Sequence, residues 1–510
     1  MRSFSFFAGL ILLATSCSLV AAATLDPRQF GAIGDGKTKD TAALQRAIDA
    51  AARVGGTVRL ATGTYLSGTL ILKSGVTLQI DKGVTLLGSP QQVDYTRNRW
   101  LALIEARRQH NIAIVGDGVI DGQGAALAAD VMRLVQEKKI VDPLTSHRPA
   151  EQNRPQLIEL LECHGVTLKG ITLKNSSCWV QTYLTCEDVT LDHVTVRSTA
   201  YWNNDGLDLV DCHRAHVTHC DIDSADDGIC LKSGERHACT DIVVEDCNLR
   251  SSANAFKLGT SSRGGFKHIQ AHRLHIHDTF RSAIALESVD GAAMQDVEVS
   301  DVDAKNTGAA IFIRLGNRQH DASPGSIRDV RISNVSVEIP ATAPDAGYPL
   351  AGPAVRGAHN LFPSSITGLP GHRVANVSLK NITITTAGDG RREVANLPLE
   401  NLAAVPEQED RYPEFSMFGE LPSWGFYVRH AEGITFENVT MRATAKDFRS
   451  VMVFDDASNV QVNHLQMGPA GDNPVIVLRG VDGWKLTDTP PPEGAREFIR
   501  NIDAAVVKKP

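Results

Sequence analysis

Short runs in which apolar and polar positions alternate recur along most of the chain. The recurring unit reads apolar-x-x-x-(Asp/Asn/Gly)-apolar-x-apolar, and successive starts from Val166 through Ala215 to Val297 fall about 23 to 28 residues apart. A strand-type alternation repeated at such a period indicates a solenoid, whose parallel strands, about 4.8 Å apart, bury one apolar face of every coil. The pattern therefore predicts an all-β chain folded as a parallel β-helix. Copies of the unit begin at Val166, Val189, Ile242, Ile269, Val297, Val330, Val377, Ile434 and Val460.

A helical pattern precedes these repeats. In DTAALQRAIDAAARVGG, Asp40 is a suitable N-cap, Gly55 is a suitable end, and one apolar stripe is formed by Leu44, Ala47, Ile48 and Ala51. One helix ahead of a strand-rich chain suits a plug over the open end of a stack of coils. We therefore expect an N-terminal capping helix.

The repeats are interrupted between about residues 340 and 425. This stretch is rich in Pro and Gly, as in GYPLAGPAVRG and RYPEFSMFGELPSWGF. It predicts long loop insertions, which in a solenoid tend to gather on one face, often the binding face.

The two ends of the chain differ from the repeats. Residues 1–23 combine an early Arg2, an apolar core and three alanines, which is typical of a cleaved secretory signal peptide. The expected organisation is a signal peptide (1–23), a β-helix catalytic domain (24–485) and a polar, Pro-rich C-terminal tail (486–510). The chain is thus expected to be secreted or periplasmic, without stable membrane insertion, since no later stretch is apolar for long enough to cross a bilayer.

Charge and cysteine content narrow the function classes. A net charge of -8 and a pI near 6.1 argue against a nucleic-acid partner, which would require a basic surface. Eight of the nine cysteines lie between Cys163 and Cys247. Four of them occupy one phase of the repeat, which predicts an interior ladder of small apolar side chains, with disulfides between adjacent rungs as the alternative. These four are Cys163, Cys186, Cys212 and Cys239.

Two acidic clusters lie about one coil apart. Asn203-Asn204-Asp205 and Asp226-Asp227 are each followed by glycine, and Asp205 precedes the later carboxylates by 21 and 22 residues. On adjacent coils such side chains would lie roughly 5 Å apart, and glycosidic hydrolysis commonly uses two carboxyl groups. Asp and Asn in turns often only bond local backbone, so it is the pairing of the clusters that favours catalysis. The spacing leaves inverting and retaining mechanisms both open.

Most of the mature chain resembles the polygalacturonase-like glycoside hydrolases, which are right-handed parallel β-helices. The resemblance lies in FGAIGDGKTKDTAALQRAI, in NSSCWVQTYLTCEDVTLDHVTV, and in NNDGLDL followed by DSADDGICLKSG. The family core is Asn-Thr-Asp-Gly with Asp-Asp one coil later, and Asn204 replaces its Thr. The resemblance implies inversion, with Asp226 as general acid and with Asp205 and Asp227 holding and deprotonating the attacking water. Lys232 matches a lysine often found after the acidic pair.

The chain departs from this family at two motifs. Where polygalacturonases carry Gly-His-Gly, this chain has ANA with Asn254 at its centre, and where they carry Arg-Ile-Lys it has ALE, ending in Glu287. In polygalacturonases the Arg and Lys of that motif hold an anionic sugar, which a glutamate would repel. Binding such a sugar would therefore require other cations in this chain. Candidates are Lys257 and the arginines of FIRLGNR, Arg314 and Arg318.

These motifs predict a set of substrate-binding residues: Asn203, Lys232, Asn254, Lys257, Glu287, Arg314 and Trp202. Trp202 would stack on a sugar ring, Trp179 is expected in coil packing, and Tyr412 belongs to the loop aromatics that would either wall a pocket or pack the insertions.

The main hypothesis is an exported, inverting glycoside hydrolase that cleaves a pectic polysaccharide or oligosaccharide of the galacturonan or rhamnogalacturonan type. It would need no cofactor and no metal ion. Two alternatives stay open: a β-helix polysaccharide lyase, with Asp205, Asp226 and Asp227 on Ca²⁺, and a non-catalytic carbohydrate-binding β-helix. The oligomeric state stays open as well.

Overall fold

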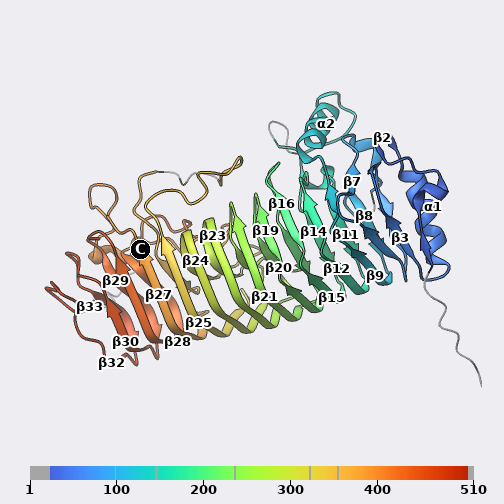
Figure 1. Cartoon of the computed structure of the whole chain (residues 1–510). Helices are drawn as coiled ribbons and strands as arrows, with labels where there is room; N and C mark the ends of the chain where they lie inside the picture. The colour runs from blue at the N-terminus through green and yellow to red at the C-terminus, as the bar shows by residue number, and fades with distance from the viewer. Residues whose placement is uncertain are drawn as a thin grey trace, which may run out of the picture.

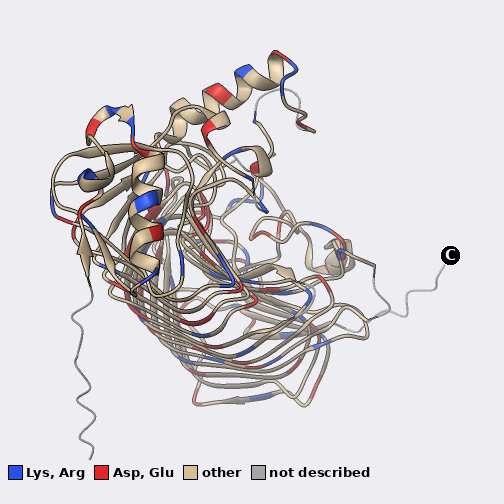
Figure 2. Cartoon of the chain, turned by 90° about the vertical axis from the view of Figure 1, so that its right-hand side faces the viewer, with Lys and Arg blue, Asp and Glu red and all other residues tan. Residues whose placement is uncertain are grey.

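The computed structural model of the chain describes residues 23–97, 99–143, 148–234, 237–320, 323–352, 355 and 357–502. The predicted signal peptide, residues 1–23, lies outside these ranges except for Ala23. The chain forms an elongated stack of coils that runs from the N-terminal to the C-terminal end without reversing (Figure 1). Viewed along the stack, successive coils superimpose into one tube (Figure 2).

Short strands make up the coils. The first coils contain β1 (Thr24–Leu25), β2 (Asp35–Lys39), β3 (Thr57–Leu60), β4 (Thr64–Ser67), β5 (Leu70–Ile71), β6 (Thr77–Ile80), β7 (Thr85–Gly88), β8 (Ala102–Arg107), β9 (His110–Val115) and β10 (Val119–Asp121). The middle coils contain β11 (Gln156–Leu161), β12 (His164–Lys169), β13 (Thr172–Lys174), β14 (Gln181–Leu184), β15 (Glu187–Asp192), β16 (Thr195–Ser198), β17 (Leu207–Val210), β18 (His213–Thr218), β19 (Asp221–Ser224), β20 (Ile229–Ser233), β21 (Cys239–Ser251) and β22 (Phe256–Ser262).

Several later strands, such as β23 and β24, are longer because they run through the corners of a coil. The later strands are β23 (Phe266–Ser288), β24 (Ala293–Leu315), β25 (Ser326–Ile339), β26 (Ser364–Thr367), β27 (Val374–Thr386), β28 (Ser423–Ala443), β29 (Ser450–Ser458), β30 (Gln461–Met467), β31 (Ile476–Asp482), β32 (Lys485–Thr487) and β33 (Ile499–Ile502). The last two pair with β30 and β31, so parallel pairing continues past residue 485, where the sequence suggested a tail.

Every paired strand is parallel to its neighbour in the next coil. In the row that carries the site, β14 pairs with β17, β17 with β20, and β20 with β22. Inward positions of this row stack Leu209 on Leu231 and Leu231 on Leu258, and all three are fully buried. The parallel β-helix predicted from the apolar alternation is therefore confirmed, with its core along the axis of the tube.

The Asp, Asn or Gly of the repeat unit stands at a sharp corner between two strands. Asp301, Asn334 and Asn381 all have a φ of 55° there, in the left-handed region that Asn, Asp and Gly tolerate best. Their side chains also bond from coil to coil, with Asn334 donating to Asp301 over 2.9 Å and Asn381 to Asn334 over 2.8 Å. The turn residue in the sequence pattern thus serves both backbone conformation and stacking.

In the described part of the chain, two α-helices and four short 3₁₀ segments lie outside the coils: α1 (Thr41–Ala52), α2 (Gly124–Gln136), η1 (Pro27–Phe30), η2 (Gln92–Asp94), η3 (Glu151–Asn153) and η4 (Leu399–Ala404). Helix α1 lies at the N-terminal end of the stack and buries the predicted stripe, including Leu44 and Ile48 (Figure 1). Asp40 precedes α1, but its carboxylate accepts hydrogen bonds from the backbone N–H groups of Ile33 and Gly34 instead of capping the helix.

The segment from residue 340 to 422 leaves the coils twice, on either side of β26 and β27. A second hydrophobic cluster, separate from the axial core, holds its second half against the outside of the tube. In that cluster the segment's Leu402, Phe415 and Phe418 lie with Phe312 and Tyr427 of the coils. The outer face of these coils is therefore covered.

All eight cysteines among the described residues are free and buried. The predicted cysteine ladder follows paired strands. The residues directly after Cys163, Cys186 and Cys212 pair with one another in register from coil to coil. The prediction of an interior ladder of small apolar side chains is confirmed for these rungs, and no disulfide links them in the described part of the chain.

Candidate active site

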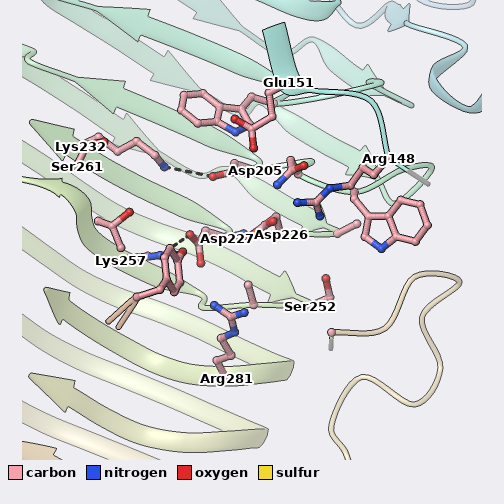
Figure 3. Close-up of a pocket in the computed structure, with 18 of the residues that line it drawn as sticks. Arg148, Glu151, Asp205, Asp226, Asp227, Lys232, Ser252, Lys257, Ser261 and Arg281 are labelled. Atoms are coloured by element: carbon pink, nitrogen blue, oxygen red, sulfur yellow. Dashed lines mark hydrogen bonds and ion pairs between the residues drawn. The ribbon is translucent and has the colours of Figure 1, made fainter. Parts of the chain in front are cut away.

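A cavity of about 580 Å³ opens on the outer face of the middle coils. Asp205, Asp226 and Asp227 lie on its floor (Figure 3). Arg148 and Glu151 line the N-terminal side, and the insertion contributes to the opposite wall. The insertion residues that line the cavity are Ala351, Gly352 and Tyr412.

The turns that carry the carboxylates stack directly on one another. Gly206 donates its N–H to the carbonyl of Asp227 over 2.9 Å, and Gly228 donates to that of Asn254 over 2.8 Å. A Cβ at Gly206 would lie 2.7 Å from the Gly228 carbonyl oxygen, and one at Gly228 would lie 2.6 Å from that of Ala255. The glycine behind each acidic cluster is therefore required by the close approach of adjacent coils.

Asp205 is held by a buried lysine from the next coil. Lys232 Nζ donates to Asp205 Oδ2 over 3.2 Å and to Asp208 Oδ1 over 2.6 Å. Burial first, and then the charge of Asp208, raises the pKa of Asp205 well above its ordinary value, and burial raises the pKa of Asp208 to about 6. Lys232 stays cationic, because its partners, Asp208 foremost, outweigh burial and raise its pKa.

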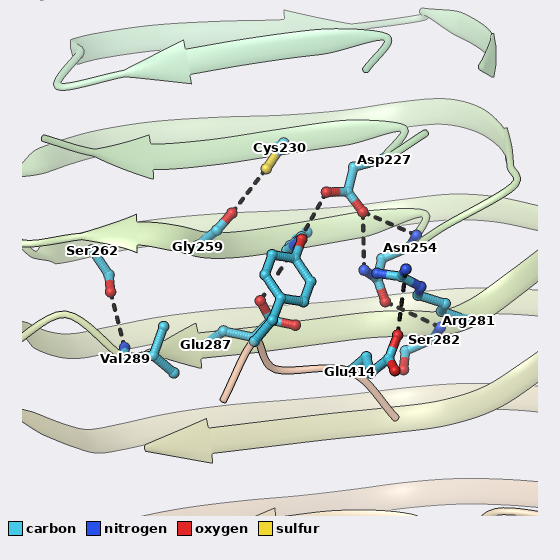
Figure 4. Close-up of polar contacts among 12 residues, drawn as sticks. Asp227, Cys230, Asn254, Gly259, Ser262, Arg281, Ser282, Glu287, Val289 and Glu414 are labelled. Atoms are coloured by element: carbon cyan, nitrogen blue, oxygen red, sulfur yellow. Dashed lines mark hydrogen bonds and ion pairs between the residues drawn. The ribbon is translucent and has the colours of Figure 1, made fainter. Parts of the chain in front are cut away.

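Asp227 is held by three donors. Lys257 Nζ donates to its Oδ2 over 2.9 Å, while the side-chain amide and the backbone N–H of Asn254 donate to its Oδ1 over 2.9 and 3.1 Å (Figure 4). Burial would raise the pKa of Asp227, but Lys257 and Lys232 outweigh it and lower the pKa to about 2. Asp227 is thus ionised at neutral pH.

Asp226 has a different environment from its neighbour. It is half-buried, and its carboxylate accepts a hydrogen bond from the backbone N–H of Asp227 over 2.9 Å. Burial, followed by the charge of Asp227, raises the pKa of Asp226. Two adjacent carboxyl groups with pKa values pushed in opposite directions form a natural acid and base pair.

Asn254, which replaces the family's histidine, does not line the cavity itself. Its amide donates to Asp227, and its Oδ1 accepts from the backbone N–H of Ser282 over 3.2 Å. Asn254 therefore fixes Asp227 to the next coil, a positioning contact that the sequence did not distinguish from substrate binding.

Glu287 lies below Lys257 and is completely buried. Its Oε2 is 3.6 Å from Lys257 Nζ, and neither of its oxygens has a hydrogen-bond partner among the described residues. Burial raises its pKa to about 7. Glu287 does not line the cavity, so the structure places it behind the floor and out of reach of a bound sugar.

Arg314 is also placed away from the cavity. It is buried beneath the insertion, where its guanidinium donates to the carbonyl groups of Gly368, Glu407 and Gln408 over 3.1, 2.6 and 3.2 Å. Arg318 forms a bidentate pair with Asp290. Both arginines are thus engaged by the protein itself.

The aromatic rim of the cavity combines Trp202 and Trp179. Trp202 is 39% exposed and lines the cavity beside Asn203, whose Oδ1 accepts from the buried Arg154 over 2.7 Å. Trp179, which the sequence placed in coil packing, lines the cavity too, with Lys232 Nζ 4.7 Å from its ring centroid.

Three further cavity residues come from distant parts of the chain. The hydroxyl oxygen of Tyr412 accepts a hydrogen bond from Lys257 Nζ over 3.2 Å, across 155 residues of sequence. Arg281 and Arg148 also line the cavity, and neither lies in a recognisable motif. No periodic signal in the sequence distinguishes them from solvent-exposed arginines.

One oxygen of Asp205 and one of Asp227 lie within 4.8 Å of each other and of Cys230 Sγ, a grouping that could hold a metal ion. The same carboxylates accept from Lys232 and Lys257, and Lys232 Nζ is 2.9 Å from Cys230 Sγ. Two ammonium groups therefore already supply the positive charge that a cation would bring.

Three carboxyl groups thus converge in an open cavity on the outer face of a parallel β-helix. The family model of glycosyl hydrolases family 28 matches residues 53–338, and the chain belongs to this family. It is a glycoside hydrolase.

A relative matches most of the chain in sequence, and solved structures match most of it in fold. A probable polygalacturonase from Vitis vinifera is 24% identical over 420 residues, covering 74% of this chain and 77% of that protein. The structure of a family 28 exopolygalacturonase from Yersinia enterocolitica matches with a TM-score of 0.60 at 19% identity, covering 92% of this chain and 79% of that one. A hyperthermoactive exopolygalacturonase from Thermotoga maritima matches with a TM-score of 0.58 at 21% identity, covering 82% and 91%. No helix among the described residues is long and apolar enough to cross a membrane.

Proposed function

We propose that the chain is an inverting glycoside hydrolase that cleaves a pectic polysaccharide or oligosaccharide of the galacturonan or rhamnogalacturonan type. The observation that carries the proposal is the unequal environment of the three carboxyl groups. Asp226 has a raised pKa and faces the cavity, whereas Asp227 is ionised between Lys257 and Asn254. The polygalacturonase named among the relatives supports the choice of substrate.

In this mechanism Asp226 gives its proton to the glycosidic oxygen as the bond to the anomeric carbon breaks. Asp205 and Asp227 hold a water molecule on the opposite face of the sugar, and ionised Asp227 takes its proton. Lys232 and Lys257 keep two carboxylates close together at a tolerable electrostatic cost. Asn203 and Trp202 would contact the sugar at the rim.

The two alternatives receive less support. A calcium-dependent lyase would use the carboxylates as ligands, yet Asp205 and Asp227 are bonded to buried lysines. A non-catalytic binder would not require adjacent aspartates with oppositely shifted pKa values. We therefore place the hydrolase first and expect it to work without a metal ion.

The outer parts of the fold also belong to this proposal. We propose that the β-helix is right-handed, that α1 caps its N-terminal end, and that the insertions between residues 340 and 422 form the wall of the substrate site. The burial of the α1 stripe and the contact between Tyr412 and Lys257 support the last two points. We also propose export to the periplasm or the medium, on the basis of residues 1–23.

The test is hydrolysis of a panel of pectic substrates, with and without chelator. New reducing ends without the absorbance of an unsaturated sugar, unchanged by chelator, identify a hydrolase. Asp226→Asn, Asp205→Asn and Asp227→Asn should each lower kcat by at least ~10²-fold, whereas the exposed Asp303→Asn should not. Near-full activity of all three site variants would refute the assignment, and NMR of the first product anomer would decide inversion.

A further inference from the structure

Two histidines occupy the same corner of neighbouring coils, outside the cavity. His193 follows β15 and His219 follows β18, and their φ values of 55° and 52° are those of the Asp and Asn corners of later coils. The backbone N–H of His193 donates to the Thr218 carbonyl over 3.1 Å, so the two corners are in direct contact. The two imidazole rings stack, with centroids 4.6 Å apart and planes 16° from parallel.

Asp192 places a carboxylate beside both rings. Its Oδ1 lies 2.5 Å from His193 Nδ1 and 3.6 Å from His219 Nδ1, while Lys169 Nζ lies 2.9 Å from its Oδ2. One donor atom from each of Asp192, His193 and His219 lies within 4.8 Å of the other two. Two ring nitrogens and one carboxylate oxygen therefore face a common point.

Other histidines on this outer face are engaged differently. One coil further on, Glu245 lies 2.6 Å from a ring nitrogen of His216 and 2.9 Å from one of His272, and it also binds the guanidinium of Arg273. That guanidinium already supplies the charge that Glu245 needs. The Oδ1 of Asp192 meets imidazole nitrogens and no guanidinium among the described residues.

The three donors are open to solvent. The side chains of His193 and His219 are 62% and 51% exposed, so their rings can tilt until both nitrogens point at a shared ligand. A hollow of about 470 Å³, lined by Asp117, Lys169 and His193 among others, lies beside the first ring. An ion can therefore reach the three donors and keep water molecules as further ligands.

We infer that Asp192, His193 and His219 bind a divalent transition-metal ion such as Zn²⁺. Imidazole nitrogens suit zinc, copper and nickel, whereas Ca²⁺ and Mg²⁺ prefer ligand sets made of oxygen. The ion replaces the proton that joins His193 Nδ1 to Asp192 Oδ1, and that proton is released to solvent. Three protein ligands and one water complete the tetrahedron that zinc favours.

The site joins the two coils that carry the acidic clusters. Strand β16 leads from the His193 corner toward Asp205, and β19 leads from the His219 corner toward Asp226. The two strands pair in register along their whole length. A bound ion fastens these coils at one end of the pair without entering the cavity at the other. It should therefore make the fold more resistant to heat and leave turnover unchanged, which goes beyond the proposed function and does not depend on it.

The experiment is calorimetric titration of the chain, prepared without a polyhistidine tag, with zinc chloride. His193→Ala and His219→Ala should each weaken Zn²⁺ binding by at least ~10²-fold, because losing a ligand costs more than losing an outer partner of one. Asp192→Asn should weaken it as well. His464→Ala is the matched control, since His464 is also an exposed corner histidine, with a φ of 57°, and it should bind Zn²⁺ like wild type.

Two further measurements separate a site from general attraction to histidines. Electron paramagnetic resonance of the Cu²⁺-loaded protein should show two nitrogen ligands in wild type and one in His219→Ala. Zn²⁺ should raise the thermal unfolding midpoint of wild type and of His464→Ala, but not that of His219→Ala.

Three results would overturn the inference: no Zn²⁺ binding by wild type, equal affinity in wild type and the double variant His193→Ala/His219→Ala, or an equal loss in His464→Ala. Hydrolysis of the pectic panel is measured on the same samples. Failure of wild type to cleave any pectic substrate would refute the proposed function and leave the Zn²⁺ titration as the separate test of the metal site.

Discussion

Replacing Glu287 by glutamine should stabilise the protein above neutral pH and not below about pH 4. Glu287 is fully buried, has no hydrogen-bond partner for either oxygen among the described residues, and lies 3.6 Å from Lys257 Nζ. Burial raises its pKa to about 7 from an ordinary 4.5. Its ionised form is therefore disfavoured in the folded state.

The magnitude follows from linkage. A carboxyl with a folded pKa above its unfolded pKa contributes stability that is complete below pH 4.5 and is lost as pH rises through about 7. A pKa difference of one unit between the folded and unfolded states corresponds to 1.36 kcal/mol, so the free energy of unfolding falls by about 3 kcal/mol by pH 8. Glutamine cannot ionise, so the Glu287→Gln variant does not lose this stability as the pH rises.

The assay is denaturant unfolding of both proteins at pH values from 4 to 8. The advantage of Glu287→Gln over wild type should grow between pH 4.5 and 7 and then level off, on top of any constant offset due to the amide. Glu338→Gln, at an exposed position of β25, is the control and should show no such growth. A difference that is flat across the whole range would refute the reasoning.

Other changes give separate outcomes. Lys257→Met should raise the pKa of Asp227 from about 2 and move the acidic limb of the pH–rate profile to higher pH, because the lysine is the main cation that opposes burial there; an unmoved limb would contradict this. Arg314→Met should free the carbonyl groups of Glu407 and Gln408, so limited proteolysis should cut the insertion faster than in wild type, while an equal rate would show that the second hydrophobic cluster holds it alone. Trp202→Ala should raise KM about fivefold with an unchanged unfolding midpoint, as expected for loss of one exposed aromatic contact. Thiol titration of residues 24–510 should find eight reactive cysteines in denaturant and almost none in native protein, and fewer than eight without reductant would reveal a disulfide.

The meeting of Asp205, Asp226 and Asp227 in one cavity was predictable because their positions follow the repeat. Once the coil length is known, Asp205 and the Asp226-Asp227 pair must fall on neighbouring turns, and the glycine behind each marks the close approach of two coils. The environment of each carboxyl was not predictable. Lys257 and Asn254 act on Asp227 from 30 and 27 residues away, and their side chains could equally have faced the substrate.

Arg314 shows the limit of the same reasoning. It occupies an outward position of β24, the strand paired with the coil of Glu287, and outward arginines of a solenoid normally face solvent or ligand. The insertion covers that position, so Arg314 binds the insertion instead. Arg281 is the opposite case: no sequence motif points to it, yet the structure places it in the cavity.

The sequence by itself determined the coil, its inward and outward faces and the convergence of three carboxylates. These features depend on the repeat length, which is visible in every copy of the repeat. The tertiary structure alone decided which outward side chains line the cavity. That choice depends on where residues 340–422 fold back, and their path is set by aromatic packing against Phe280, Phe312 and Tyr427. A non-repeating loop carries no periodic signal, so its contacts with the cavity, Tyr412 and Glu414 above all, exist only once the chain has folded.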